Sequence, residues 1–279
     1  MARAVHGASV MQPRPQEKSL VDRLGQWCGA LMAPITGLVS NLRQARMFHP
    51  DGVVYLARVE PIETAAIDLR EVAGRLSGRA VVRLSSAWWR GGKEWMDVLG
   101  LALRFVRPNH TASALPEAGD QDLLLATIRF PWTTPLAPLA TRVSNFLWND
   151  FHAVSPFAVE GLGRVKLRLR SPKIANGRGQ SRAEHLAGVV AANAAVYELQ
   201  ARRLERPVHR RSWEGFAKVV LERPLDVDQA ALRFSPFLDG RGVRPVGFVH
   251  HLRLATYAAS QRARPASEPA RSGRRGGSS

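Results

Sequence analysis

Two groups of residues in this chain have types and spacing suited to chemistry. In the first group, Arg46 and His49 lie just ahead of Gly52 and a stretch rich in valine. A histidine at the start of a strand would lie at the edge of a sheet, facing a cavity. Because an imidazole titrates near neutral pH, it can act as a general base and then as a general acid.

The second group lies near the C-terminus. Residues 246–264 contain no proline, and Pro265 follows, so the pattern predicts an amphipathic helix that ends there. On such a helix Arg253, Tyr257 and Arg264 fall within about 40° of one another. An arginine one turn from a tyrosine favours the phenolate, which suits ferric iron and is a known haem ligand type. The alternative is that Tyr257 packs in a core while Arg253 is solvated.

These groups need a scaffold, and the stretches between them look like strands. The segment 164–170 alternates apolar and basic residues, which is typical of a strand with one buried face. Eight such segments predict an α+β protein built on an eight-stranded antiparallel barrel with flanking helices. The predicted strands are 52–62, 79–89, 99–106, 122–130, 164–170, 197–202, 216–225 and 230–237.

Composition separates the chain into a core and two tails. Residues 1–18 show no periodicity and predict a flexible arm, and residues 265–279 predict a disordered basic tail. Residues 19–264 then form the core. Hydrophobic residues make up 45% and charged residues 23% of the 279 residues, which excludes disorder over the whole length.

Charge, cysteine content and one apolar stretch bear on partners and location. The net charge is +17, but only five of the 40 basic residues are lysines and the arginines are scattered. Nucleic acid is therefore not expected as the main partner. Cys28 is the only cysteine, so an intrachain disulfide is excluded and a reducing cytoplasm fits. The uncharged stretch 24–40 predicts a helix that packs on the core or on a second copy in a homo-oligomer, with peripheral membrane contact as the alternative.

The two groups and the strands between them match one family in order and spacing. The chain resembles the haem catalases, in particular the small catalase-related peroxidases, over residues 46 to 264. The matching pieces are Arg46-x-x-His49 before Gly52, Val82 to Ser86, Asp97 to Phe105, Gln121 to Leu123, and Arg253-x-x-x-Tyr257 with Arg264.

The resemblance implies one haem b and assigns roles by position. His49 would be the catalytic distal histidine, and Ser85 would hydrogen-bond and orient its ring. Tyr257 would bind the iron, supported by Arg253. The haem propionates would meet Arg46, Arg83 and Arg264, because guanidinium groups pair bidentately with carboxylates.

The chain departs from that family at the distal amide. Ala126, followed by Thr127, occupies the position of an asparagine that helps to bind peroxide. The region after Tyr257 reads Ala258, Ala259 and Ser260 rather than Pro-Asp-Thr. We therefore expect a haem peroxidase of hydrogen peroxide or of organic and lipid hydroperoxides. The alternative is a catalase-fold haem-binding or interaction protein that has lost catalysis.

Overall fold

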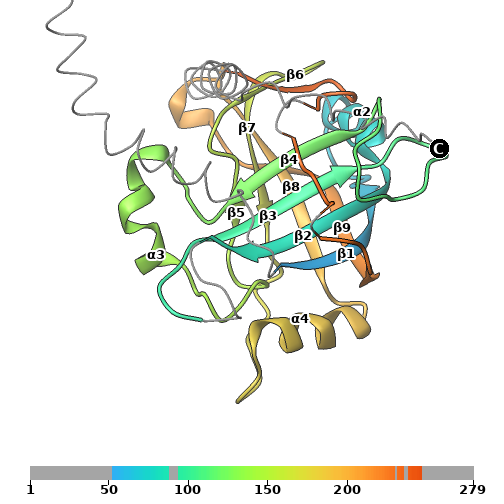
Figure 1. Cartoon of the computed structure of the whole chain (residues 1–279). Coiled ribbons are helices and arrows are strands. Elements are labelled where there is room, and N and C mark those ends of the chain that lie inside the picture. The colour runs from blue at the N-terminus through green and yellow to red at the C-terminus, as the bar shows by residue number, and fades with distance from the viewer. Residues whose placement is uncertain (1–51, 88–93, 230, 236–237, 247–279) are drawn as a thin grey trace, which may run out of the picture. The chain divides into compact units, whose positions relative to one another are not determined.

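Eight antiparallel strands close into a β-barrel in the computed structural model (Figure 1). The structure describes residues 52–87, 94–229, 231–235 and 238–246. Around the barrel the order is β7-β5-β4-β3-β2-β1-β9-β8, and β8 pairs again with β7. The strands are β1 Val53–Pro61, β2 Gly78–Ser86, β3 Leu99–Phe105, β4 Gln121–Ala126, β5 Phe151–His152, β7 Gly163–Arg170, β8 Val196–Arg203 and β9 Glu214–Pro224.

Two further strands extend the sheet beyond the barrel. The strand β6, Phe157–Val159, pairs with the first half of β7, on the same edge where β5 pairs with its second half. The strand β10, Val243–Pro245, then pairs with β6. These pairs place residues 243–245 beside residues 157–159, which lie near the middle of the sequence.

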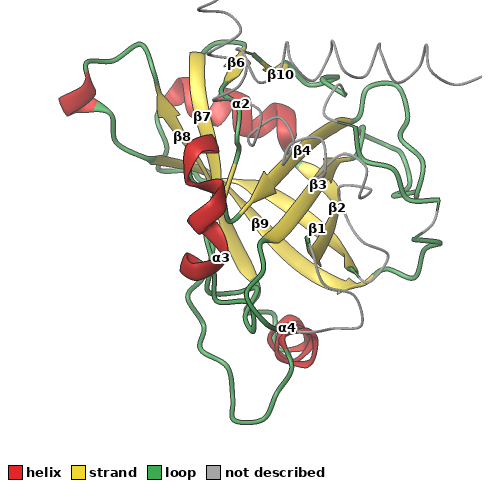
Figure 2. Ribbon diagram, turned by 60° about the vertical axis from the view of Figure 1, so that its left-hand side comes forward, coloured by secondary structure: helices red, strands yellow, loops and turns green. Residues whose placement is uncertain are grey.

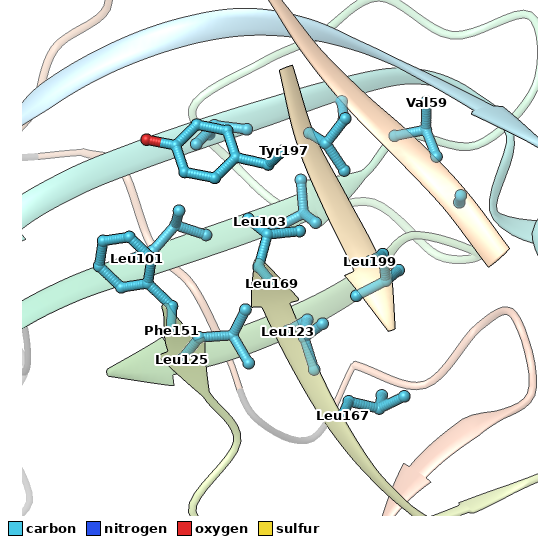
Figure 3. Close-up of a cluster of buried hydrophobic side chains, with 14 of the residues drawn as sticks. Val59, Leu101, Leu103, Leu123, Leu125, Phe151, Leu167, Leu169, Tyr197 and Leu199 are labelled. Atoms are coloured by element: carbon cyan, nitrogen blue, oxygen red, sulfur yellow. The ribbon is translucent and has the colours of Figure 1, made fainter. Parts of the chain in front are cut away.

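The barrel interior is filled with aliphatic and aromatic side chains, because alternate residues of each strand point inward. Figure 3 shows core side chains that come from β1, β3, β4, β5, β7 and β8. At its centre Phe151 and Tyr197 have ring centroids 6.4 Å apart. Other core members in this view are Val59, Leu101, Leu103, Leu123, Leu125, Leu167, Leu169 and Leu199.

Short helices lie outside the barrel (Figure 2). The helix α2 spans Ile67–Leu76 and buries one apolar face against the core. The helix α4 spans Arg182–Ala191 and begins with a capping box, in which Ser181 and Glu184 satisfy each other's backbone N–H groups. The remaining elements are α3, Ala137–Ala140, and two 3₁₀ helices, η1, Pro131–Leu136, and η2, Val208–Arg210.

Seven of the eight predicted strands correspond to β1, β2, β3, β4, β7, β8 and β9. The eighth prediction is wrong, because residues 231–235 form no strand. There Leu232 and Phe234 pack on the outside of the barrel against Val54 and Val81. The two-residue strand β5 closes the barrel instead.

The predicted helix 246–264, apart from Val246, lies outside the described residues, as do the predicted arm 1–18, the stretch 24–40 and the tail 265–279. In the described part of the chain, no helix has the length and apolar character needed to span a membrane.

Candidate functional site

One row of paired residues crosses the outer face of the barrel over four neighbouring strands. Ser85 of β2 pairs with Gly100 of β3, Gly100 pairs with Ala126 of β4, and Ala126 pairs with His152 of β5. Their neighbours Leu84, Leu101, Leu125 and Phe151 belong to the barrel core, so the row faces outward. Since adjacent strands lie about 4.8 Å apart, Ser85 and Ala126 are separated by about 10 Å.

A second row runs parallel to the first, one step further along the same face. It consists of Arg83, Ala102 and Leu124. Ala102 is fully buried and Arg83 is 5% exposed. The two rows together place a strip of small residues, namely Gly100, Ala102 and Ala126, beside an arginine and a serine.

The chain enters β1 at the edge of this strip. The β1–β2 register pairs Val53 with Leu84, and extending it by one position puts Gly52 opposite Ser85. A Cβ atom on Gly52 would lie 2.8 Å from Nε of Arg83 and 3.0 Å from the carbonyl oxygen of Leu84. The backbone therefore approaches Arg83 at a distance that only glycine allows without displacement.

The side chain of Ser85 is buried, and its hydroxyl group makes no hydrogen bond with the described residues. Its exposed fraction is 1%, and its Oγ has no hydrogen-bond partner among the residues that the structure describes. A buried hydroxyl left unpaired costs roughly 1–3 kcal/mol, and such groups are rare enough to need an explanation. The side chain therefore has a donor and acceptor available for another group.

Thr127, the residue that follows Ala126, is held by hydrogen bonds within the fold. The hydroxyl of Thr127 accepts a hydrogen bond from the backbone N–H of Leu99 at 3.1 Å. It also lies 2.8 Å from the hydroxyl of Thr141, which in turn donates to the carbonyl oxygen of Ala137. These bonds fix the segment after β4 to α3, so Thr127 has a structural role.

Structural roles are also filled by Arg104 of β3 and by Gln121 and Asp122 of β4. Arg104 and Asp122 form a buried bidentate ion pair across β3 and β4, with Nε–Oδ1 and Nη2–Oδ2 distances of 2.8 and 3.0 Å. Gln121 donates hydrogen bonds to the carbonyl oxygens of Leu238 and Val243. These side chains hold residues 231–235 and 238–245 against the barrel.

Sequence reasoning missed His152, which ends the row beside Ala126. Burial, followed by the nearby cations Arg168 and Arg129, lowers its pKa from 6.5 to about 4, although Asp150 opposes the shift. The imidazole is therefore neutral at pH 7. Its strand has only two residues, so no alternating pattern marked it in the sequence.

Of the predicted site residues, the structure describes Arg83 and Ser85 and brings them together on adjacent rows of one face. The others, Arg46, His49, Arg253, Tyr257 and Arg264, lie outside the described residues. Within the described ranges, no three or more His, Cys, Asp or Glu side chains are grouped to hold a metal ion.

Comparison with known proteins identifies no relative, since neither a family model nor a curated protein matches the chain.

Proposed function

We propose that this chain is a haem-dependent peroxidase with a catalase-like barrel, acting on organic or lipid hydroperoxides in preference to hydrogen peroxide. The observation that carries the proposal is the outer row of Gly52, Ser85, Gly100 and Ala126. Three of these residues, Gly52, Ser85 and Gly100, come from separate pieces of the sequence that resemble the catalase family, and Ala126 stands where that family has an asparagine. Their alignment on one face supports a single site formed by these segments.

The residues of this face fit a flat macrocycle. Gly100, Ala102 and Ala126 present little side-chain volume, Ser85 offers an unused hydroxyl, and the Arg83 guanidinium suits a propionate carboxylate. The resemblance adds Arg46, Arg253 and Arg264 around the group and Tyr257 as its iron ligand. Haem held by a tyrosine supplies iron chemistry that cleaves the O–O bond of peroxides.

The chain's own acid–base group would be His49. Two residues, Pro50 and Asp51, separate it from Gly52, and three consecutive Cα–Cα steps span at most about 11 Å. His49 therefore starts within reach of Ser85, which lies opposite Gly52 by the extended register. In this proposal the Ser85 hydroxyl hydrogen-bonds the imidazole and orients it, and His49 moves a proton between the two peroxide oxygens.

The preference for larger hydroperoxides follows from Ala126. A preorganised donor at this position would contribute roughly 3–4 kcal/mol where it acts on developing charge, and neither Ala126 nor the engaged Thr127 supplies one. Hydrogen peroxide has almost no surface to bury in compensation. An apolar tail that buries roughly 100 Å² regains about 2.5 kcal/mol at 25 cal/mol per Å².

The experiment compares two substrates on haem-loaded protein, by oxygen release from hydrogen peroxide and by consumption of cumene hydroperoxide. We expect weak oxygen release and faster consumption of the organic hydroperoxide, and Ala126→Asn should raise oxygen release. His49→Ala should slow both reactions by about 10²–10⁴-fold. Fast oxygen release by the unmodified protein would contradict the substrate preference. Absence of reaction with either peroxide would favour the non-catalytic haem-binding alternative.

A further inference from the structure

Among the described residues, a group of cations on the outer face of β7 and β8 has no acidic partner of the kind that balances other basic residues of the barrel. Lys166 of β7 lies directly opposite Arg202 of β8, and like charges at directly opposed positions destabilise a sheet. Arg129, which follows β4, lies close enough to disfavour the charged form of both. Burial, then Arg202 and Arg129, lower the pKa of Lys166. We call Arg129, Lys166 and Arg202 the basic cluster.

The ion pairs of neighbouring strand residues make this contrast clear. Arg168, two positions from Lys166, lies 3.7 Å from Asp150, and Arg203, next to Arg202, lies 2.6 Å from Asp68. The described residues place no carboxylate within ion-pair distance of any member of the basic cluster. The Nε atom of Arg202 is also buried with no hydrogen-bond partner in that part of the chain. The cluster therefore keeps its charge for an external anion.

Two aromatic rings hold the cluster in place. The Nζ atom of Lys166 lies 4.8 Å from the ring centre of Phe130, and Arg202 lies 4.8 Å from that of Trp213. Phe130 in turn stacks on Trp132, with ring centres 4.8 Å apart and ring planes 11° apart. This stacking connects the basic cluster to the helical segment η1–α3.

That segment exposes three large apolar side chains to solvent within eight residues. Trp132 is 69%, Leu136 63% and Leu139 68% exposed. Leu136 and Leu139 are three residues apart at the junction of η1 and α3, a spacing that brings two side chains near one another in both kinds of helix. Trp132 lies in the first turn of the same segment. Figure 2 shows α3 standing on the outside of the barrel. We call Trp132, Leu136 and Leu139 the apolar ridge, and exposed apolar groups gathered in this way mark binding surfaces.

We propose that the apolar ridge and the basic cluster together bind the surface of a membrane that contains anionic lipid. Leucine and tryptophan side chains insert at the boundary between headgroups and acyl chains, where tryptophan is enriched. Lys166, Arg129 and Arg202 would then face the phosphate groups, and each cation near an anionic surface adds to binding. This surface borders the outer row at His152, whose pKa Arg129 and Lys166 help to lower.

Charge complementarity favours lipid over two other occupants. A second copy bound through the same surface in a two-fold dimer would place each patch against itself, so the two basic clusters would repel each other. Single-stranded nucleic acid would use the cations and Trp132 for stacking, but it gives no reason for exposed leucines at 136 and 139. Both occupants are outcomes of the test below.

The experiment is sedimentation of the full-length protein with vesicles, without added haem. One vesicle is phosphatidylcholine alone, and the other contains about one third phosphatidylglycerol. We expect binding to the anionic vesicle only, weakened at high salt. Lys166→Gln with Arg202→Gln should lower the partition coefficient about 25-fold, from roughly fivefold per charge. Leu136→Ser with Leu139→Ser should lower it by at least about tenfold.

Matched controls separate this surface from the general positive charge of the chain. Lys218→Gln with Arg223→Gln removes two charges from exposed positions of β9, and Ile67→Ser with Leu115→Ser removes two exposed apolar side chains elsewhere. Both controls should bind as the unmodified protein does, and thermal unfolding checks that every variant is folded. Equal losses in test and control variants would overturn the proposal. So would equal binding to both vesicles, binding to a single-stranded oligonucleotide but to neither vesicle, or a change of oligomeric state in the leucine variants without a change in partition.

Discussion

The buried ion pair of Arg104 and Asp122 allows a quantitative test of whether these two residues are structural. Their side chains are 1% and 0% exposed. Asp122 also accepts the backbone N–H of Ser235 at 2.7 Å, and Arg104 donates to the carbonyl oxygens of Ala114 and Arg233. Asp122→Leu leaves the guanidinium charge buried without its counter-ion, which costs roughly 3–5 kcal/mol.

The expected change in melting temperature follows from the size of the protein. For a domain of 150–250 residues each kcal/mol shifts the melting temperature by about 2–4 °C, so Asp122→Leu should lower it by about 6–20 °C. Arg104→Met should do the same. The double variant removes both charges, and replacing a buried pair by apolar residues is often nearly neutral, so it should recover most of the loss. The assay is a double-mutant cycle by thermal unfolding. Additive losses in the double variant would refute the reasoning.

Three smaller changes test the geometry of the outer row. Ser85→Ala removes a buried hydroxyl without a partner in the described residues, so the free energy of unfolding should stay equal or rise by about 1 kcal/mol while the peroxide reaction slows about tenfold. A fall in both the free energy of unfolding and the rate of the peroxide reaction would show that the hydroxyl is structural. His152→Gln should reduce the loss of stability below pH 6.5. Because the pKa of His152 in the folded chain is about 4, the unfolded chain binds a proton between pH 6.5 and 4 that the folded chain does not bind. This difference costs the folded state at most about 3 kcal/mol by pH 4. The assay is urea unfolding at pH 7 and pH 4.5. An equal loss of unfolding free energy in the variant and in the unmodified protein would contradict this prediction. Gly52→Ala should cost about 1–3 kcal/mol, because the new Cβ would lie 2.8 Å from Nε of Arg83, and an unchanged melting temperature would show that the backbone is not held there.

The barrel was predictable from sequence because most of its strands have one buried face. The alternation of Val165, Leu167 and Leu169 with basic residues marked β7 to within one residue. The predicted strand 230–237 was misleading, since its described apolar residues Leu232 and Phe234 pack on the barrel without pairing into the sheet. In contrast, the strand β5 is only two residues long and carries no pattern.

Only two of the predicted site residues lie in the part of the chain that the structure describes. Sequence order and spacing selected Arg83 and Ser85, which the structure places on one face. The alignment of Ser85, Gly100, Ala126 and His152 depends on the register of three strand pairs, and no single segment of the sequence contains that information. The opposition of Lys166 and Arg202 was hidden likewise, because it arises only when β8 closes the barrel against β7.

The measurement that tests the central claim most directly is the absorption spectrum of the purified protein titrated with haem. The account predicts saturable binding of one haem per chain, with a Soret band and charge-transfer bands typical of tyrosine ligation. Tyr257→Phe should lose the haem or those bands, while Tyr55→Phe, which alters a tyrosine buried in the barrel core, should keep both. A chain that binds no haem, or a Tyr257→Phe variant whose spectrum is unchanged, would contradict the account.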